Sequence, residues 1–163
     1  MTQQAPSKTA GDAVLQTAIQ MEEMGGDFYE AFAVATEEPK VRQLCQRLAA
    51  VELNHRNVFQ QMRSELARRG RTILVPADYL ATMRQRARKA IVPDPDTIRQ
   101  MLSKGDTRSL LDMAVQMEQD SIRFYSSFID SVPDRGILEA IIREEQEHLR
   151  LLQAAGLGEE IRR

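Results

Sequence analysis

Two sets of four residues repeat along the chain in the same order and with similar spacing. In each set a glutamate is followed seven residues later by a tyrosine, and a Glu-x-x-His pair comes next. The sets are Glu22, Tyr29, Glu52 and His55, then Glu118, Tyr125, Glu145 and His148, and they use both histidines of the sequence. Four carboxylates and two imidazoles in this arrangement are what two adjacent iron or manganese ions need inside a four-helix bundle.

The four glutamates fall at inward positions of otherwise apolar helical stripes. The stripe around Glu22 reads, at helical spacing, Leu15, Ala18, Glu22, Gly25, Tyr29 and Phe32. Burying one unpaired carboxylate is costly, and no lysine or arginine lies in these stripes to neutralise the four charges. Two divalent cations would balance them. The alternative compensation is protonation of the glutamates.

The Glu-x-x-His spacing has a geometric reason. Residues i and i+3 lie on one helix face about 5 Å apart, so both side chains converge on one site. The predicted metal ligands are Glu22, Glu52, His55, Glu118, Glu145 and His148. We predict that Glu52 and Glu145 bridge the two metals and that each histidine binds one metal. The remaining two glutamates would be terminal ligands, one per metal.

Oxygen-rich ligation with one imidazole per ion predicts two iron ions, with manganese as the alternative. Structural zinc sites usually recruit thiolates, and Cys45 lies outside the set. The competing interpretation is a metal-free bundle in which the spacing is coincidental. A single Glu-x-x-His pair is a weak signal, but two pairs that each follow an inward Glu/Tyr helix are far more specific.

Further residues lie close to the predicted ligands. Tyr29 and Tyr125 fall two turns beyond a glutamate, and either pack in the core with the hydroxyl bonded to a glutamate, or orient a carboxylate and supply an electron or proton. Gly25 and Gly26 either open room for a small oxidant or allow close helix packing. The other glutamates next to the ligands, Glu144 among them, are expected to point into solvent; Glu144 is the best spare ligand, because it precedes His148 by four residues.

The elements that must position these residues are four long helices. The pattern predicts helices from about Asp12 to Ala35, from Pro39 to Gly70, from Asp106 or Thr107 onward, and from about Asp134 to Ala155, closed by Gly156. Short loops make each successive pair an antiparallel hairpin. Residues 71–105 are a predicted crossover with short helices near 77–89 and 95–103, the second capped by Asp94. The fold class is therefore all-α, a four-helix bundle of two duplicated hairpins.

Bulk composition agrees with this architecture. The chain has 163 residues, 42% apolar and 28% charged, with a net charge of −2, which gives no sign of nucleic-acid binding. We expect residues 1–10 to form a flexible arm and residues 11–163 a single domain. One cysteine excludes an internal disulfide, and no apolar run approaches the roughly 20 residues that cross a bilayer. We expect a cytoplasmic protein without a membrane partner.

Four segments resemble the rubrerythrin family of ferritin-like di-iron proteins. They are AIQMEEMGGDFYEAFA, LAAVELNHRNVF, MAVQMEQDSIRFY and IIREEQEHLRLL. The resemblance spans residues from about 12 to 155 and implies a left-handed ferritin-like bundle with a carboxylate-bridged di-iron centre, often in a dimer. We accordingly expect a homodimer. By similarity, the six predicted ligands match the metal-binding motifs of the family.

The sequence departs from the rubrerythrin pattern in two ways. Rubrerythrins proper add a rubredoxin-type iron domain with two Cys-x-x-Cys pairs, whereas this chain has one cysteine. It would therefore need an external electron donor. They also carry a second glutamate on the third helix, which lets one iron shift on reduction. Here that position is Ser121, so His55 would be a permanent ligand.

These expectations lead to one main functional hypothesis and two alternatives. The main hypothesis is a non-haem di-iron oxidoreductase that reduces hydrogen peroxide or dioxygen with electrons from an external donor. The first alternative is a ferroxidase that feeds iron storage or delivery. The second is a metal-stabilised interaction module without turnover.

Overall fold

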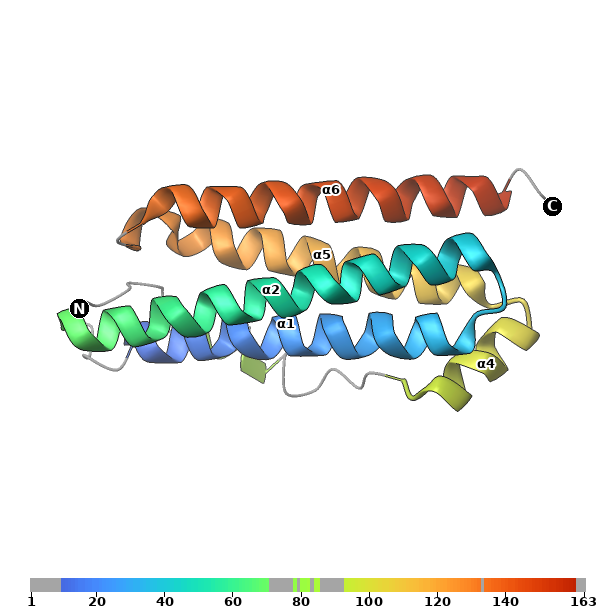
Figure 1. Ribbon diagram of the computed structural model, residues 1–163, viewed down its shortest axis with the longest axis horizontal. Coiled ribbons are helices and arrows are strands. Elements are labelled where there is room, and N and C mark those ends of the chain that lie inside the picture. The colour runs from blue at the N-terminus through green and yellow to red at the C-terminus, as the bar shows by residue number, and fades with distance from the viewer. Residues whose placement is uncertain are drawn as a thin grey trace.

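The four predicted long helices are present and lie side by side. The computed structural model describes residues 10–70, 78, 80–82, 84–85, 93–132 and 134–160. The long helices are α1 (Ala10–Ala35), α2 (Pro39–Arg69), α5 (Thr107–Phe128) and α6 (Arg135–Glu160), as Figure 1 shows. The described residues contain no strand. The prediction of an all-α, ferritin-like four-helix bundle is confirmed.

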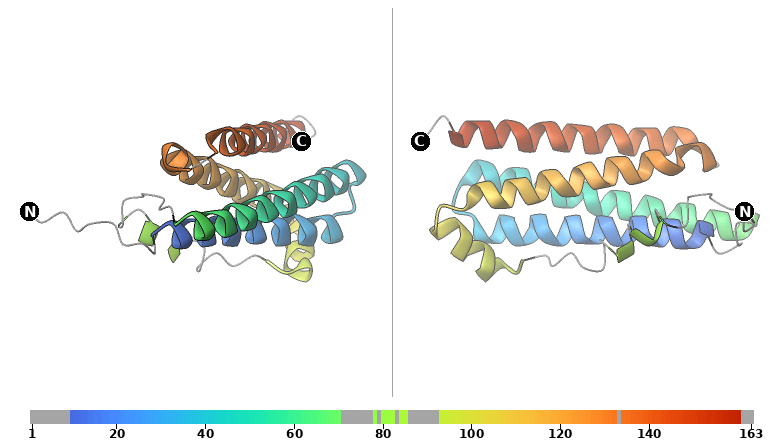
Figure 2. Two further views of the ribbon diagram at one scale, coloured as in Figure 1. Left: turned by 60° about the vertical axis from the view of Figure 1, so that its left-hand side comes forward. Right: turned by 180° about the vertical axis from the view of Figure 1, so that it is seen from behind.

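The helices form two antiparallel hairpins, α1 with α2 and α5 with α6 (Figures 1 and 2). The hairpins meet through contacts of α1 with α5 and of α2 with α6. Because α2 ends at one end of the bundle and α5 begins at the other, the chain between them is a crossover along the length of the bundle. The bundle therefore consists of two antiparallel hairpins joined by one long connection.

Local sequence signals account for three of the helix ends. Pro39 is the first residue of α2, where its fixed φ suits the helix and its missing N–H costs nothing. Gly70 ends α2 with a φ of 61°, a left-handed conformation that glycine adopts without a Cβ penalty. The short helix α4 (Pro95–Ser103) begins after Asp94, whose side chain accepts hydrogen bonds from the N–H groups of Asp96 and Thr97. All three predicted signals are confirmed.

One predicted helix end is wrong, and one predicted helix lies partly outside the described residues. The prediction that Gly156 closes the last helix is wrong, because α6 continues to Glu160. Gly156 lies inside the helix, and a Cβ there would make only ordinary contact with Leu111. An interior glycine costs about 1 kcal/mol against alanine, which is too little to end a packed helix. The predicted helix near 77–89 lies partly outside the described residues. The residues of this range that the structure describes, 78, 80–82 and 84–85, are helical.

The core consists of two apolar clusters, one toward each end of the bundle. The first includes Leu15, Phe59, Phe124 and Ile141, and the second includes Phe32, Leu48, Ala114 and Leu152. Each of the four long helices therefore contributes to both clusters. The glutamates and histidines of the repeated motifs lie between the two clusters along every helix, so the polar layer is closed by apolar side chains on both sides.

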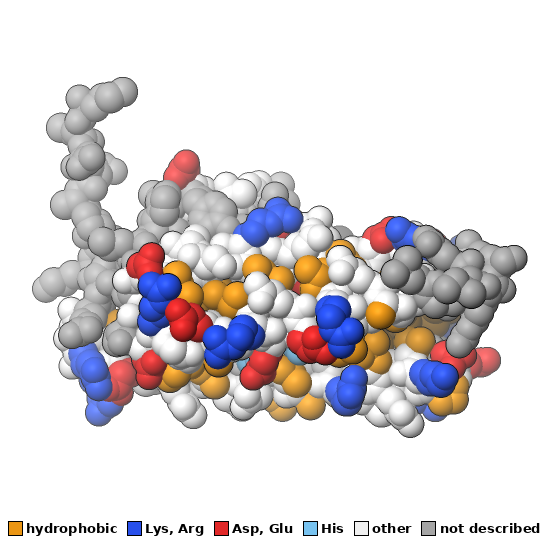
Figure 3. All heavy atoms as spheres, turned by 90° about the horizontal axis from the view of Figure 1, so that it is seen from above, with side chains coloured by type: hydrophobic (Ala, Val, Ile, Leu, Met, Phe, Trp, Pro, Cys, Tyr) orange, Lys and Arg blue, Asp and Glu red, His pale blue; other side chains and the backbone are white. Residues whose placement is uncertain are grey.

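Charged side chains cover much of the outer surface. Figure 3 shows acidic and basic side chains mixed along one face rather than gathered by sign. Many are paired within one helix, such as Arg150 with Glu147 at 2.6 Å and Arg135 with Glu139 at 2.6 Å. Exposed pairs of this kind contribute little to stability. They leave the buried acidic layer as the main electrostatic feature of the fold.

Candidate metal centre

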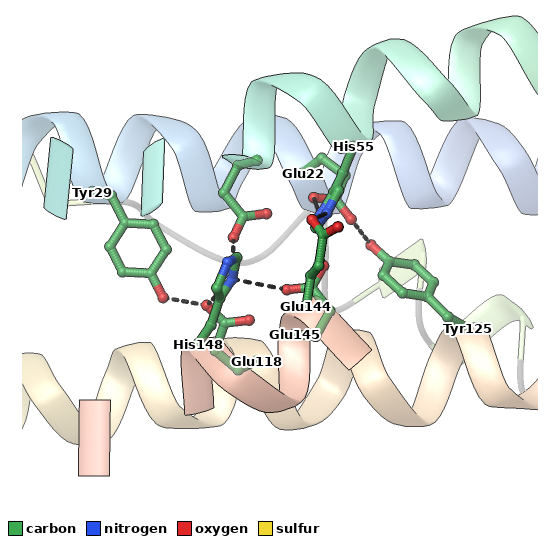
Figure 4. Close-up of polar contacts among 9 residues, drawn as sticks. Glu22, Tyr29, His55, Glu118, Tyr125, Glu144, Glu145 and His148 are labelled. Atoms are coloured by element: carbon green, nitrogen blue, oxygen red, sulfur yellow. Dashed lines mark hydrogen bonds and ion pairs between the residues drawn. The ribbon is translucent and has the colours of Figure 1, made fainter. Parts of the chain in front are cut away.

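The structure brings the six predicted ligand residues together in the middle of the bundle. Each hairpin contributes one glutamate from its first helix and a Glu-x-x-His pair from its second (Figure 4). Their side chains are almost completely buried, with exposed fractions of 2% for Glu22, 5% for Glu52, 1% for His55, 3% for Glu118, 0% for Glu145 and 5% for His148. The helical spacing of the stripes thus predicted their burial.

The six residues form two overlapping groups that are able to hold metal ions. One group is Glu22, Glu52, His55 and Glu145; the other is Glu52, Glu118, Glu145 and His148. Within each group one ligand atom from every residue lies within 4.8 Å of the others. Glu52 and Glu145 belong to both groups, which is the sharing that bridging carboxylates require. The individual ligand roles stay a prediction.

Both histidines turn the Nδ1 atom toward the carboxylates. Nδ1 of His55 lies 2.9 Å from Glu145 Oε1 and 3.5 Å from Glu22 Oε2. Nδ1 of His148 lies 3.1 Å from Glu145 Oε2 and 3.3 Å from Glu52 Oε1. The two imidazole rings are stacked with their centroids 6.1 Å apart. His55 therefore belongs to one of the two ligand groups and His148 to the other.

Five buried polar atoms of the centre lack hydrogen-bond partners. Within the described part of the chain, six buried side-chain atoms have none, and five of them belong to this centre: Glu22 Oε2, both carboxylate oxygens of Glu145, and Nδ1 of His55 and of His148. Unsatisfied buried polar groups are rare in folded proteins and cost free energy. Oxygen and imidazole donors gathered in this way fit divalent iron or manganese.

Without cations, the centre is electrostatically strained. Burial raises the pKa of Glu22, Glu52 and Glu118 above the ordinary glutamate value, that of Glu118 to about 7. Burial opposes the charge of His148, but its carboxylate neighbours outweigh burial and raise its pKa to about 12. In His55 the same balance raises the pKa to about 11. Protons thus occupy the charge-balancing role that metal ions would otherwise fill.

The two buried tyrosines connect the hairpins across the centre. The hydroxyl of Tyr29 donates a hydrogen bond to Glu118, and that of Tyr125 donates one to Glu22 (Figure 4). Each tyrosine therefore reaches the glutamate of the other hairpin and not the one on its own helix. Burial and the adjacent negative charges raise the pKa of both hydroxyls, which keeps them protonated and donating.

For two further residues the structure shows which contacts they make. Glu144 lies with its carboxylate 2.9 Å from Nε2 of His55. Gly25 does not open an empty space, because a Cβ there would lie 3.3 Å from Cδ and Oε2 of Glu52. Both departures from the repeat were visible as signals, since Val51 and Ser121 stand at the corresponding positions of the other half. The sequence did not indicate which residues Glu144 and Gly25 would contact.

The family model described as Rubrerythrin matches residues 13–156. A search of the curated proteins and a search of the solved structures each found no match. Among the described residues, no helix combines the length and the apolar character that crossing a membrane requires. The match covers nearly all of the four long helices and the whole buried centre, and the chain therefore belongs to the rubrerythrin family.

Proposed function

We propose that this protein is a non-haem di-iron oxidoreductase that reduces hydrogen peroxide or dioxygen with electrons from an external donor. Its membership of the rubrerythrin family supports di-iron chemistry in general. The observation that carries the proposal is that five buried carboxylate oxygens and imidazole nitrogens have no hydrogen-bond partner. Their residues lie in two four-residue groups that share Glu52 and Glu145. A bundle without a cation-binding role would have no reason to leave them unsatisfied.

The residues of the two groups would hold one iron ion each, with the shared glutamates between them. When bound, two ferrous ions supply the two electrons that cleave the O–O bond of one hydrogen peroxide molecule, and two protons complete the formation of two water molecules. The external donor then returns the two electrons.

The protein itself contributes geometry, protons and exclusion of water. Tyr29 and Tyr125 fix the orientation of Glu118 and Glu22 and place a proton beside each carboxylate. The two apolar clusters close the centre along the bundle axis, which strengthens the electrostatic interactions inside it. These effects keep the donor atoms in place before an oxidant arrives.

Anaerobic stopped-flow spectroscopy of the diferrous protein tests this proposal. We expect oxidation by one equivalent of hydrogen peroxide at about two irons per chain, and re-reduction by a small artificial donor. Absence of oxidation by either peroxide or dioxygen would contradict the proposal. Uptake of many irons per chain into a shell-sized particle would instead support the ferroxidase alternative.

A further inference from the structure

The two halves of the centre are not equivalent around their histidines. In the repeated motif, His55 corresponds to His148 and Glu52 to Glu145. The residue before the glutamate is Val51 in α2 but Glu144 in α6. At this position the second hairpin therefore carries a carboxylate that the first hairpin lacks.

Glu144 contacts the histidine of the other hairpin. Its carboxylate lies 2.9 Å from Nε2 of His55, whereas Nδ1 of the same ring faces the carboxylates of Glu22 and Glu145 (Figure 4). In the metal-free protein both nitrogens of this ring face carboxylates and the raised pKa keeps the ring protonated. When a metal ion displaces the proton from Nδ1, the carboxylate of Glu144, which accepts hydrogen bonds, would hold the remaining proton on Nε2. The lone pair of a neutral imidazole then lies on Nδ1, where a metal ion would be bound.

His148 lacks this support. Its Nδ1 also faces carboxylates, but no described side chain hydrogen-bonds its Nε2 atom. An apolar residue, Val51, stands at the position corresponding to Glu144. Within the described part of the chain, no carboxylate therefore holds a proton on Nε2 of His148 or raises the basicity of this ring from that side.

We propose that Glu144 is a positioning residue that makes the group of Glu22, Glu52, His55 and Glu145 the tighter of the two metal sites, so that the two ions bind in a fixed order. The inference rests on metal binding, which is part of the proposed function, but not on any reaction with peroxide or dioxygen. Loss of an outer hydrogen-bond partner of a ligating histidine typically lowers metal affinity by about 10- to 100-fold. Because the side chain of Glu144 is 53% exposed, solvent screens it and the lower end of this range is expected.

The test is titration of the metal-free, full-length chain with Co²⁺, followed by visible absorption and calorimetry. Wild type should bind one ion tightly and a second more weakly. Glu144→Ala should weaken the first step about 10-fold and leave the second unchanged. Glu144→Gln, which keeps an acceptor without the charge, should lie between the two. The control is Glu147→Gln on the same helix, since Glu147 is an exposed glutamate paired with Arg150; it should match wild type.

A reciprocal variant tests the same idea by gain of affinity. Val51→Glu adds a carboxylate at the corresponding position of α2 and should tighten the second step, bringing the two affinities together. In zinc-loaded protein, ¹⁵N shifts of the His55 ring should show the proton on Nε2 in wild type. The proton stays on Nε2 in Glu144→Ala, because the metal occupies Nδ1, but its resonance should shift and its exchange with solvent should become faster once the hydrogen bond to Glu144 is lost, whereas a purely structural role would move neither.

The outcomes separate this inference from the proposed function. Equal Co²⁺ affinities in wild type, Glu144→Ala and Glu147→Gln would overturn it, and so would equal weakening of both steps, which indicates general loss of negative charge. Ordered binding that depends on Glu144, in a protein whose diferrous form does not react with either oxidant, would support the inference and contradict only the proposed function. Failure of wild type to bind any Co²⁺ would overturn both.

Discussion

Two tyrosine hydroxyl groups and one glycine without a Cβ determine how the glutamates of this centre are placed. Tyr29 and Tyr125 each place one proton against a buried carboxylate of the opposite hairpin. Gly25 allows the side chain of Glu52 to pass where a Cβ would press on it. These contacts constrain Glu22 and Glu118 as well as Glu52, so small substitutions around the centre should change metal binding more than they change the fold.

Removing a tyrosine hydroxyl should destabilise the metal-free protein. Tyr125→Phe leaves a buried oxygen of Glu22 without its donor, and an unsatisfied buried polar group costs about 1–3 kcal/mol. We expect a loss of about 2 kcal/mol in the free energy of unfolding, measured with urea. Tyr29→Phe, which removes the equivalent bond to Glu118, should give a similar loss. Unchanged stability in both variants would show that these bonds do not form in solution.

Adding a methyl group at Gly25 should impair metal binding without impairing folding. In Gly25→Ala the new Cβ lies 3.3 Å from Cδ and Oε2 of Glu52, so this carboxylate must move by a few tenths of an ångström. We expect about a tenfold loss in Fe²⁺ affinity, similar to loss of an outer-shell contact. The thermal stability of the metal-free protein should hold, since alanine favours helix by about 1 kcal/mol over glycine.

Gly26→Ala is the matched control for the variant at Gly25. A Cβ there would lie 3.8 Å from Cβ of Glu52, which is an ordinary contact away from the carboxylate. Its Fe²⁺ affinity should equal that of wild type. If both alanine variants bind Fe²⁺ as tightly as wild type, the close approach at Gly25 does not constrain Glu52.

Among the elements, α1 is the most enclosed. It contacts α2 and α5 within the bundle, and α4 of the crossover covers part of its remaining surface. Ile98 anchors this cover, because its side chain is completely buried in the same apolar cluster as Phe28 and Phe32. The crossover thus does more than connect the hairpins: it helps to bury the helix that carries Glu22.

Truncating this anchor should lower stability. Ile98→Ala removes a fully buried side chain, and such changes cost about 2–5 kcal/mol. Urea unfolding of the metal-free protein measures the effect. Val34→Ala serves as the control, because Val34 is 61% exposed and its truncation should change stability by no more than about 0.5 kcal/mol. Equal effects of the two substitutions would argue against a packed crossover.

At the scale of the whole molecule, protons and metal ions compete for one buried centre. In the metal-free fold the pKa of Glu118 is raised from 4.5 to about 7, and that of His55 from 6.5 to about 11. The folded state therefore binds these protons more tightly than the unfolded state. Their stabilising contribution is complete below the unfolded pKa values and is lost as pH rises through the folded values. Metal ions, in contrast, bind best when the protons have left.

The stabilisation by metal should therefore increase with pH. Between about pH 5 and 8 the metal-free protein loses stability as Glu118 ionises in its buried position, while the loaded protein does not. We expect the difference between the melting temperatures of Mn²⁺-loaded and metal-free protein to widen over this range, and a chelator to abolish it. If the difference in melting temperature narrowed with rising pH, protons and metal ions would not be competing for the same buried centre.

Much of the fold and most of the centre were predictable from local patterns. Inward glutamates at helical spacing had to face a common interior, since periodicity alone decides which face of an amphipathic helix is buried. Pro39, Gly70 and Asp94 act on their own backbone, so the helix ends that they set followed directly. Gly156 gave a misleading signal because packing in the bundle outweighs the modest local cost of a helical glycine.

The amino-acid sequence by itself determined four helices, their hairpin pairing, and six buried side chains of the types that bind iron. Only the tertiary structure decided which side chains meet across the hairpins: Tyr29 with Glu118, Tyr125 with Glu22, and Glu144 with His55. The physical reason is that spacing along a helix fixes the direction of a side chain relative to its own axis. The register and separation of two packed helices depend instead on the fit of all their side chains together.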